Sequence, residues 1–383
     1  MRICLVTPGF SADADDWCIP ALRHLAAGLV RAGHQVHVLA VRYPFRPGSY
    51  ELSGIRVTAV AGAQRQNWSS VGVWRRAFAA LAAEHRRRRF DVLQAFWATE
   101  SGALAALAGR LLDVPTVVSL AGGELACLPD IGYGGQLALS ERLTIRLALR
   151  LASAVTAGSF ELVQRASPRL QGRPSARALR LPLGVDLSLF SPAPGPAAEP
   201  LPLRLIQVGS LIPVKDQVTL LQAAARLRRL GVEFSLEVVG AGPLAPQLAT
   251  LAGELDLDRV VHLLGALPHH HLPQVYRTGA VYVCSSSHEA QGMAPLEAAA
   301  CGLPVVGTNV GILPELSPEA AIVTPVGDPS ALADALAGLL GDRQRRCTMG
   351  RSARSKVEQE FGVERCTERF GDLHRALAQT SRR

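Results

Sequence analysis

The stretch LRLIQVGSLIPVKDQVTLLQAAARLRRLGVEFSLEVVG, residues 203–240, predicts a strand, a helix and a second strand in that order. An apolar run over 203–211 enters a loop at Gly209, residues 218–231 have the apolar spacing of a helix, and 234–240 form another apolar run. Strands joined by a helix of this length pair in parallel, because a parallel connection has to cross over the sheet. This stretch therefore predicts a parallel α/β sheet.

The beginning of the chain repeats this order of elements. RICLVTPGF, residues 2–10, predicts a strand that ends in a Pro-Gly loop, residues 19–34 predict a helix, and QVHVLAV, residues 35–41, predicts a second strand. Strands that alternate with helices in this way build doubly wound sheets with helices on both faces. The sequence thus predicts an α/β protein with two Rossmann-like, doubly wound parallel-sheet domains.

The expected domain limits follow from local composition. Residues 189–202 include SPAPGPAAEPLP, and this density of proline is typical of a linker. We expect an N-terminal domain at 1–188 and a C-terminal domain at 203–365 on either side of it. The end of the chain is charged and has a helical pattern, so we expect a C-terminal helix at 366–383 that could pack back on the N-terminal domain.

The composition is that of a globular protein, with 48% apolar and 19% charged residues. The first apolar run stops at Thr7, which is too short for a signal peptide, and no apolar run approaches the roughly 20 residues of a membrane helix. The seven cysteines have neither CxxC spacing nor the Cys/His spacing of zinc sites. We therefore expect reduced thiols, no metal site and a cytoplasmic protein.

Positive charge is concentrated in the first half of the chain. Residues 1–190 hold 22 arginines and 13 acidic residues, a net charge of +9, whereas the whole chain carries +8. This excess indicates contact with an anionic surface or substrate. Within this half, residues 67–89 predict an amphipathic helix that ends in the run Arg86–Arg89. Its apolar face is formed by Trp74, Phe78, Leu81 and His85.

Two interpretations of the helix at 67–89 stay open. It can pack its apolar face on the first sheet as an ordinary surface helix, or it can dock on an anionic membrane. Nucleic-acid binding is a poorer interpretation, because the basic run lacks interleaved aromatic residues and a recognisable binding fold. The sequence therefore predicts no nucleic-acid partner, and a location in the cytoplasm that includes peripheral contact with the inner face of the membrane.

Two glutamates stand eight positions apart in SSSHEAQGMAPLEAAACGLPVV, residues 285–306, among small and apolar residues. Pro295 suits the first position of a helix and Gly302 its end, which gives a helix of about two turns. Glu297 then lies in the first turn, where a carboxylate stabilises the helix dipole, and this is the plain structural interpretation. Glu289 precedes the helix and has no such explanation.

The start of this helix also suits a phosphate. Ala294 has no side-chain acceptor that could cap the helix, so the amides around Met293 and Ala294 are left without a cap. Gly292 allows the backbone to approach a ligand closely. An uncapped helix start can bind a phosphate, and a carboxylate on either side can accept hydrogen bonds from vicinal sugar hydroxyls. These residues predict a sugar-nucleotide site in which one glutamate holds a ribose and the other a hexose.

HEAQGMAPLEAAACGLPVVGTNVGILPE, residues 288–315, resembles the E-x7-E signature of the family 4 glycosyltransferases. The resemblance extends to four further stretches, which are LPLGVDLSLFSP at 181–192, VVGAGPL at 238–244, LGALPHHHLPQVYRTGAVYVCSSSHE at 264–289 and VTPVGDPSALADALAGLL at 323–340. In the last stretch Asp328 suits a helix N-cap and Pro329 the first helical position. The resemblance covers nearly the whole chain.

The resemblance implies the GT-B architecture, with two Rossmann-like domains that face each other across a cleft. It also implies transfer of a hexose from a nucleotide-diphosphate sugar with retention of configuration, and we expect no metal and no other cofactor. The catalytic residues would be Lys215, which neutralises the donor diphosphate, and Glu289, which contacts the transferred sugar. The other expected donor-site residues are Glu297 at the ribose and Gly184, Gly209, Ser210, Gly292, Met293 and Ala294 in the surrounding loops.

The chain departs from the family pattern at three places. Its first loop has only Gly9 where the family often has paired glycines. Many relatives carry a histidine where Ala121 stands and an arginine where Ser210 stands. These departures leave open two alternatives, a non-catalytic nucleotide-sugar-binding paralogue and a nucleotide-sugar epimerase of the same fold. We expect a glycan, a lipid-linked sugar or a small molecule as the acceptor. The residues that would contact it from the first domain are Gly9, Asp16, Trp17, Gly122, Glu124, Asp130 and Tyr133.

Four histidines are not assigned to the site. The run His269–His271 between Pro268 and Pro273 predicts a polar loop that starts a helix, in preference to a metal-binding tract. His288, beside Glu289, fits a site contact and a packed loop residue equally well.

Overall fold

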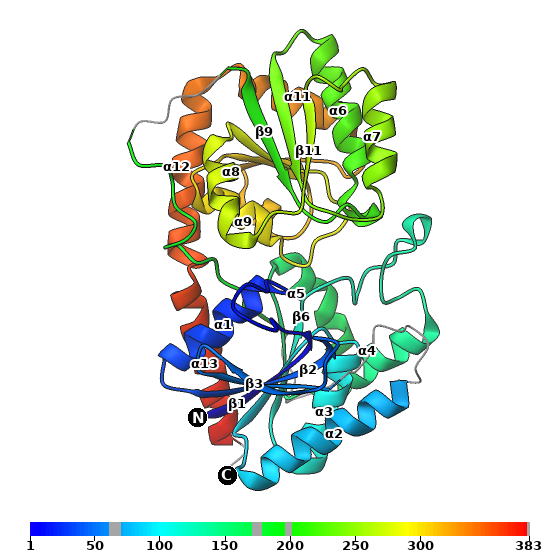
Figure 1. The fold of residues 1–383 in the computed structure, drawn as a ribbon, viewed down its shortest axis with the longest axis vertical. Helices are drawn as coiled ribbons and strands as arrows, with labels where there is room; N and C mark the ends of the chain where they lie inside the picture. The colour runs from blue at the N-terminus through cyan, green and yellow to red at the C-terminus, as the bar shows by residue number, and fades with distance from the viewer. Residues whose placement is uncertain (61–69, 171–177, 196–200, 381–383) are drawn as a thin grey trace. The chain divides into compact units, whose positions relative to one another are not determined.

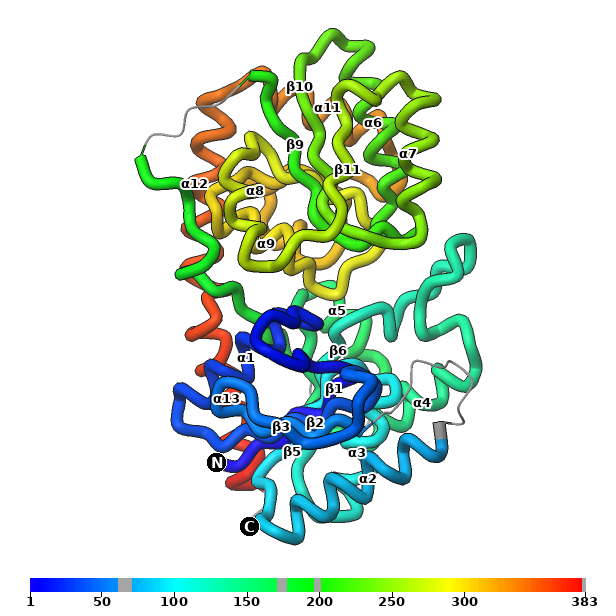
Figure 2. The backbone as a smooth tube through the Cα atoms, viewed as in Figure 1, coloured from blue at the N-terminus to red at the C-terminus, as the bar shows by residue number. Residues whose placement is uncertain are grey.

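The chain forms two compact units in the computed structural model (Figures 1 and 2). Unit 1 comprises Met1–Gly184 together with Val363–Arg383, and unit 2 comprises Val185–Gly362. The structure describes residues 1–60, 70–170, 178–195 and 201–380. Parts of three predicted segments therefore lie outside the described residues: 67–69 of the amphipathic helix, 196–200 of the linker and 381–383 of the C-terminal helix.

The division between the units differs in position from the expected domain limits. Unit 1 ends at Gly184 instead of 188, and the chain returns to it at Val363 instead of 366. Leu189 and Phe190, the first residues of the expected linker, pack in a hydrophobic core of unit 2, where Phe190 is fully buried. Burial of this aromatic side chain fixes the start of the proline-rich segment to unit 2.

Unit 1 is built around an eight-stranded sheet with the strand order β3-β4-β2-β1-β5-β6-β7-β8. Its elements in chain order are β1 (Arg2–Gly9), α1 (Pro20–Arg31), β2 (Gln35–Tyr43), β3 (Gly48–Leu52), β4 (Ile55–Ala59), α2 (Ser70–Arg87), β5 (Val92–Phe96), α3 (Glu100–Leu112), β6 (Thr116–Leu120), η1 (Pro129–Ile131), α4 (Leu139–Leu151), β7 (Ala154–Ala157), α5 (Phe160–Ala166), η2 (Ser167–Leu170), β8 (Ala178–Arg180) and α13 (Val363–Thr380). All pairs are parallel except β3 with β4, so a hairpin forms one edge of the predicted parallel sheet.

The C-terminal helix α13 packs in unit 1 against α1 and β5. Nε2 of its residue His374 lies 2.7 Å from Oε1 of Gln94, and Gln94 Nε2 donates to Ser119 Oγ at 2.6 Å. Ser119 Oγ in turn lies 2.6 Å from the Thr156 hydroxyl, so hydrogen bonds cross β5, β6 and β7 in the core. Burial lowers the pKa of His374 to about 3, and the ring that joins the helix to the sheet is therefore neutral at pH 7.

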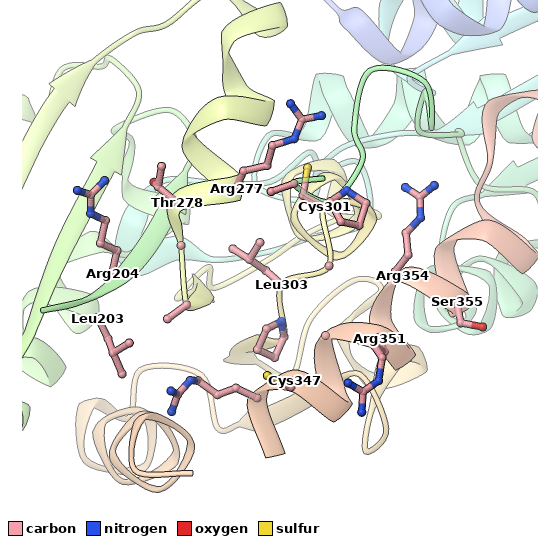
Figure 3. Close-up of a pocket in the computed structure, with 18 of the residues that line it drawn as sticks. Leu203, Arg204, Arg277, Thr278, Cys301, Leu303, Cys347, Arg351, Arg354 and Ser355 are labelled. Carbon is pink, nitrogen blue, oxygen red and sulfur yellow. The ribbon is translucent and has the colours of Figure 1, made fainter. Parts of the chain in front are cut away.

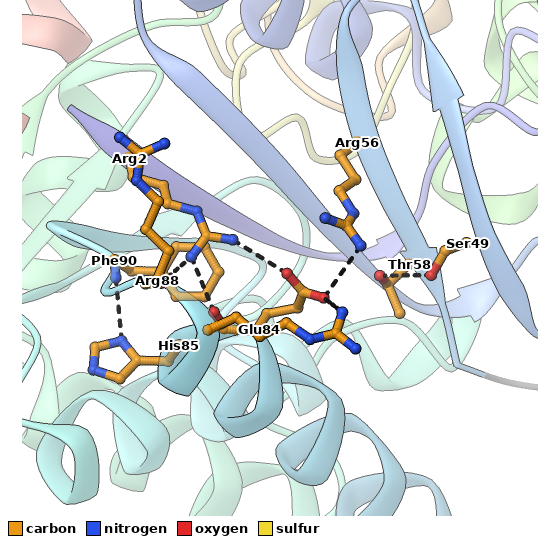
Figure 4. Close-up of polar contacts among 9 residues, drawn as sticks. Arg2, Ser49, Arg56, Thr58, Glu84, His85, Arg88 and Phe90 are labelled. Carbon is orange, nitrogen blue, oxygen red and sulfur yellow. Dashed lines mark hydrogen bonds and ion pairs between the residues drawn. The ribbon is translucent and has the colours of Figure 1, made fainter.

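The helix α2 uses its apolar face inside unit 1. Val73 and Leu81 are buried, and the helix packs against α3 and β2. Near its last turn Glu84 is buried and forms ion pairs with Arg2, Arg56 and Arg87, which ties the helix to β1 and β4 (Figure 4). The interpretation of this segment as a surface helix packed on the sheet is confirmed. Because its apolar face packs inside unit 1, little of that face is available to contact a membrane.

Unit 2 is built around a six-stranded, fully parallel sheet with the order β11-β10-β9-β12-β13-β14. Its elements are β9 (Leu203–Val208), η3 (Pro213–Lys215), α6 (Gln217–Arg229), β10 (Phe234–Val239), α7 (Ala245–Glu254), β11 (Val261–Gly265), η4 (His269–His271), α8 (Leu272–Thr278), β12 (Val281–Cys284), α9 (Met293–Ala300), β13 (Val305–Thr308), α10 (Leu313–Leu316), β14 (Ala321–Thr324), α11 (Pro329–Leu340) and α12 (Arg343–Glu360). Separate apolar cores lie under α6, α7 and α11 and under α8 and α9, as expected for a doubly wound sheet.

Capping residues set several of these helix starts. The Asp328 carboxylate accepts from the amides of Ser330 and Ala331, with Pro329 at the first position of α11, so the predicted cap is confirmed. The Asp216 carboxylate caps α6 in the same way through the amide of Thr219. Because Asp216 directly follows Lys215, this cap also fixes where the lysine backbone lies.

Candidate active site at the carboxyl edge of unit 2

The strand order of unit 2 reverses between β9 and β12, since β10 and β11 lie on one side of β9 and β12 to β14 on the other. Ligands of doubly wound sheets bind outside the carboxyl ends of the strands at such a reversal. Lys215 lies in the loop that follows β9, and Glu289 lies in the loop that follows β12. The topology thus brings two residues that are distant in sequence to the same point of the sheet edge.

Lys215 and Glu289 form an ion pair at this point. Lys215 Nζ donates to Glu289 Oε1 at 2.5 Å, and the same oxygen accepts from Ser286 Oγ at 2.7 Å. The side chains are 24% and 13% exposed, so solvent or a ligand can still reach both. In addition, Ser285 Oγ donates to the Lys215 carbonyl at 2.9 Å and holds the two loops together.

The helix α9 begins two residues earlier than its sequence predicts. Met293 is its first residue, and Gly292 stands at the N-cap position with a φ of 96°, which favours glycine. No side chain caps this start, so the amides of Met293 and Ala294 remain as predicted without a side-chain acceptor. The expectation that Glu297 lies in the first turn is wrong, because the earlier start moves it into the second turn.

A glycine packs closely against the loop that carries Glu289. A Cβ atom on Gly311 would lie 2.5 Å from the Gln291 carbonyl oxygen and 2.7 Å from Glu289 Cβ, at a φ of 57°. The next amide, that of Ile312, donates to the same Gln291 carbonyl at 2.7 Å. The loop between the two glutamates is therefore held by the loop that follows β13, a contact that sequence reasoning did not identify.

Glu297 is buried and both of its carboxylate oxygens have protein partners. His269 Nε2 lies 2.9 Å from Oε1, and the Tyr276 hydroxyl donates to Oε2 at 3.1 Å. Burial, together with the neighbouring Glu297, raises the pKa of Tyr276 well above its ordinary value, so the phenol stays a donor. Each carboxylate oxygen keeps a second lone pair, and Glu297 can therefore still accept a ligand hydroxyl.

His269 and Tyr276 were missed by sequence reasoning. The predicted polar turn at the start of a helix is present, since η4 leads into α8, but His269 is buried with its ring 5.1 Å from that of Phe190 in an edge-on arrangement. A spacing of seven residues, about two helical turns, puts the two side chains on one face when the segment is helical. The seven-residue spacing of His269 and Tyr276 was therefore the sequence feature from which their shared position could have been predicted. His288 is also buried.

The remaining residues predicted for the donor site belong to both units. Gly209 and Ser210 follow β9 at the carboxyl edge; Ser210 is exposed and its carbonyl accepts from Gln217 Nε2 at 3.1 Å. The turn after β10 packs tightly on them, since a Cβ on Gly240 would lie 1.9 Å from the Gly209 carbonyl oxygen. Gly184 is the buried last residue of the first segment of unit 1.

In unit 1 the strand order reverses between β1 and β5, and the end of β1 and the loop after it carry three of the expected acceptor-side residues. Gly9 ends the strand. Asp16 accepts from the Ala12 amide and from the Tyr43 hydroxyl, both at 2.7 Å, and the hydrogen bond from Tyr43 raises the pKa of that phenol to about 12. Trp17 lies under the Arg23 guanidinium, 4.2 Å from it. Asp16 and Trp17 shape the loop and remain partly exposed, whereas Gly9 is buried.

Glu124 does not have the exposed position expected of an acceptor contact. It is 2% exposed, and its carboxylate accepts from the amides of Ala98, Ala121 and Gly122 at 3.1, 3.1 and 2.7 Å. Burial raises the pKa of this carboxyl, and the amide hydrogen bonds oppose the shift. Glu124 therefore joins the loops after β5 and β6, and the Gly122 amide, expected to face a ligand, is used inside the protein.

Two other expected acceptor-side residues lie further along the same loop. Asp130 is exposed in η1, whereas Tyr133 is half-buried and its ring stacks over Gly123. Trp97, at the end of β5, was not identified from the sequence. It has a φ of 65°, which is rare for a bulky residue and marks a sterically fixed turn at the strand reversal.

A cavity of unit 2, of about 470 Å³, lies at the opposite, amino edge of the sheet (Figure 3). Arg277 donates to the carbonyl and hydroxyl of Ser191, and Arg354 donates to the carbonyls of Phe190 and Ala300. The guanidinium groups labelled in Figure 3 point in different directions and do not converge on one centre. The arginines of this cavity hold neighbouring segments of unit 2 together, and the cavity is not the site predicted from the sequence.

Two other kinds of feature are absent from the described ranges. No three His, Cys, Asp or Glu side chains there are grouped so that they could hold a metal ion. No helix in the same ranges combines the length and the hydropathy that crossing a bilayer requires.

Two family models match the chain and together cover most of it. The model described as "Glycosyl transferase 4-like domain" matches residues 19–184, and the model described as "Glycosyl transferases group 1" matches residues 198–356. The first match lies within unit 1 and the second within unit 2.

Relatives and solved structures agree with the family models. A D-inositol 3-phosphate glycosyltransferase of Kineococcus radiotolerans is 29% identical over 395 residues, which cover 93% of this chain and 89% of the relative. Sucrose-phosphate synthase from Thermosynechococcus elongatus has a TM-score of 0.83 at 21% identity over 99% of both chains. Anabaena HepE in complex with UDP-glucose has a TM-score of 0.76 at 18% identity, over 98% of this chain and all of that one. These structures have the GT-B fold that the sequence predicts.

Proposed function

Since the chain belongs to the family 4 glycosyltransferases and has the GT-B fold, we propose that it transfers a hexose from a nucleoside-diphosphate sugar to an acceptor with retention of configuration. The observation that carries this proposal is the Lys215–Glu289 ion pair at the strand reversal of unit 2, beside the uncapped start of α9. A cation, a carboxylate and free helix amides are the groups that a sugar diphosphate requires. The UDP-glucose complex of HepE supports a donor of this class.

The donor diphosphate is placed between Lys215 and the first amides of α9. Negative charge develops on the leaving phosphate as the bond between the sugar carbon and the phosphate oxygen breaks. Lys215 Nζ and the amides of Met293 and Ala294 stabilise that charge from fixed positions. This chain's own residues can therefore carry the charge of the leaving group.

The ion pair implies an exchange of partners when the donor binds. In the structure Lys215 is neutralised by Glu289. A diphosphate carries more negative charge than one carboxylate and attracts the ammonium group away from it. The released Glu289 oxygens then accept hydrogen bonds from hydroxyls of the transferred sugar, which positions the sugar carbon for attack.

Glu297 receives the ribose of the donor in this proposal. His269 and Tyr276 already hold both carboxylate oxygens, at 2.9 and 3.1 Å, so the group is fixed before the ligand arrives. A preorganised acceptor loses less freedom on binding than a mobile one. His269 and Tyr276 are therefore positioning residues that act through Glu297.

The acceptor is proposed to be a glycan, a lipid-linked sugar or a small molecule, contacted by exposed parts of unit 1. Asp16, Trp17, Asp130 and Tyr133 remain candidates, because each keeps some accessible surface, whereas Glu124 does not. The proposal also includes peripheral contact of the basic unit 1 with an anionic membrane.

Calorimetry with UDP- and GDP-hexoses, paired with donor consumption in the presence of an acceptor panel, tests the proposal. We expect micromolar to millimolar donor binding, turnover with at least one acceptor, and a product anomer identical to that of the donor by NMR. Binding without turnover would identify a non-catalytic nucleotide-sugar-binding protein, and an epimerised sugar formed without acceptor would identify an epimerase. Absence of binding by both nucleotide classes contradicts the site itself.

The ribose assignment has its own test. Glu297→Gln keeps the size of the side chain but replaces one acceptor oxygen with a donor. The wild type is expected to bind a ribonucleotide more tightly than its 2′,3′-dideoxy analogue, by about tenfold. The variant should lose most of that discrimination. Equal discrimination in a folded variant would remove Glu297 from the ribose site.

A further inference from the structure

We propose that the outward face of α4 docks unit 1 on an anionic lipid bilayer. The face carries a row of exposed leucines, Leu139, Leu143 and Leu147, with exposed fractions of 66%, 56% and 38%. Leu137, just before the helix, is 39% exposed. Single exposed leucines are common, but four along one helix and its entry form a continuous apolar strip.

The leucine row lies on the side of α4 away from most of its buried residues, and Leu139 and Leu143 also line a hollow of about 390 Å³ that reaches Arg169. Leu139, Leu143 and Leu147 follow one another at intervals of four residues, which places them on one side of a helix. The buried residues of α4 are Ile145, Ala148 and Leu149, and at about 100° per residue they lie roughly opposite the leucines. The buried side packs against α3 and β6, beside which Figure 1 labels α4. The core of unit 1 is therefore satisfied without the leucine row.

A row of arginines runs beside the leucines. Arg142, Arg146 and Arg150 repeat at the same interval of four and are exposed. Within the described part of the chain none of these three guanidiniums forms an ion pair. An exposed apolar strip flanked by unpaired cations is the arrangement of helices that lie in the headgroup region of anionic membranes.

The charge of the whole unit has the same sign. Unit 1 holds 27 arginines and 15 acidic residues, a net charge of +12, whereas unit 2 holds 13 basic and 17 acidic residues, a net charge of −4. All of the net positive charge of the chain, +8 in total, is therefore located in unit 1. The electrostatic field of unit 1 attracts an anionic surface.

A second copy of this chain is a poorer occupant of the α4 face. Two such faces packed on each other would bring Arg142, Arg146 and Arg150 close to the same arginines of the other copy. Glu141 is the one acidic residue of α4, and it stands in the first turn. Like charges in contact are unfavourable, whereas anionic lipids neutralise all three arginines.

The position of α4 suits a lipid-linked acceptor. The loop that carries Asp130 and Tyr133 leads directly into α4 through Leu137. A bilayer bound at α4 would therefore lie close to the loop that carries two of the acceptor-side candidates. Docking itself does not depend on the proposed reaction, and vesicle binding measures it without turnover.

Flotation of the full-length protein with vesicles tests the proposal. The vesicles contain 30% phosphatidylglycerol in phosphatidylcholine, or phosphatidylcholine alone. We expect binding to the anionic vesicles, little binding to the neutral ones, and release at 1 M salt, where the screening length falls to about 3 Å. The variant Arg142→Gln/Arg146→Gln/Arg150→Gln should weaken binding by about a hundredfold, at about fivefold for each arginine. The variant Leu139→Ser/Leu143→Ser/Leu147→Ser should weaken it by at least tenfold.

Matched controls separate the face from general charge and general apolarity. Arg86→Gln/Arg89→Gln/Arg110→Gln removes the same three charges from other exposed positions of unit 1. Leu230→Ser/Leu264→Ser removes exposed leucines of unit 2. Both controls should bind within about threefold of the wild type, because non-contacting charges act only through the screened field.

Four results would overturn the proposal. The first is no binding to anionic vesicles, and the second is equal loss in the α4 variants and in their controls. The third is binding to anionic vesicles that neither α4 variant weakens. The fourth is a wild-type dimer in light scattering that the leucine variant converts to a monomer, which would assign the face to self-association. Circular dichroism and melting temperature of each variant verify that the exposed substitutions leave the fold intact.

Discussion

Glu289→Gln is the change that tests the site most sharply, because it should alter binding and turnover in opposite directions. The substitution removes one negative charge next to Lys215 Nζ, which lies 2.5 Å from Glu289 Oε1, and keeps an oxygen at the same place. Lys215 is then no longer neutralised by a neighbouring carboxylate. A diphosphate should therefore bind more tightly to the variant than to the wild type.

The size of the effect follows from the geometry of the pair. The side chains are 24% and 13% exposed, so water screens the interaction, and a water-like dielectric gives a lower bound on the attraction. Two unit charges at this distance then interact by about 1.7 kcal/mol, which corresponds to a gain of roughly tenfold in diphosphate affinity. Turnover should fall by about a hundredfold, because the transferred sugar loses the carboxylate that positions it.

Calorimetry with pyrophosphate, UDP and GDP measures the gain independently of the base. The matched control is Glu319→Gln, which removes the same charge from an exposed residue just before β14, at the amino edge of the sheet. A double-mutant cycle with Lys215→Ala completes the design, since the gain requires the ammonium group. The reasoning is refuted if Glu289→Gln binds diphosphate no better than the wild type, or if the same gain persists in the Lys215→Ala background.

Three further outcomes can be measured on the same protein. Lys215→Ala should lower kcat by about two to three orders of magnitude, the effect of losing one fixed charge stabiliser; near-normal steady-state rates would exclude the lysine from the mechanism. Tyr276→Phe should weaken ribonucleotide binding by about fivefold through loss of one hydrogen bond to Glu297, with little effect on pyrophosphate; an equal loss for both ligands would indicate general damage. Burial lowers the pKa of His37 to about 4 and the pKa of His374 to about 3, from an ordinary value of 6.5. The stability that the two neutral rings provide is therefore present above pH 6.5 and is lost as the pH falls toward the lowered pKa values. Urea unfolding at pH 7 and pH 5 should show a loss of about 2 kcal/mol for each ring, and His374→Gln should flatten the dependence; a midpoint that does not change over this range would contradict the assignment.

The amino-acid sequence was sufficient to predict the architecture and to nominate candidate site residues. Alternation of apolar runs with helical patterns predicts parallel α/β sheets because a parallel pair needs a crossover helix, and both units have such sheets. The Asp328 cap and the glycine stop after α9 are local features, since they involve neighbouring residues, and both were predictable. The family resemblance and the chemistry of their loops predict Lys215 and Glu289 as donor-site residues, and the structure shows that the two side chains form an ion pair.

The contacts that join distant segments follow from the packing of the folded chain. The strand order 11-10-9-12-13-14 brings the loop of Lys215 to that of Glu289, and nothing in either loop specifies the other. Burial decided the roles of His269 and Glu124. The His269 ring packs beside Glu297, and the Glu124 carboxylate accepts hydrogen bonds from three backbone amides. The spacing of the α4 leucines is that of a helix face packed on a core, so the sequence alone does not show that they are exposed. Their exposure is visible only in the folded unit. Local patterns record which side chains are apolar or charged, whereas the packing of other segments determines which of them water still reaches.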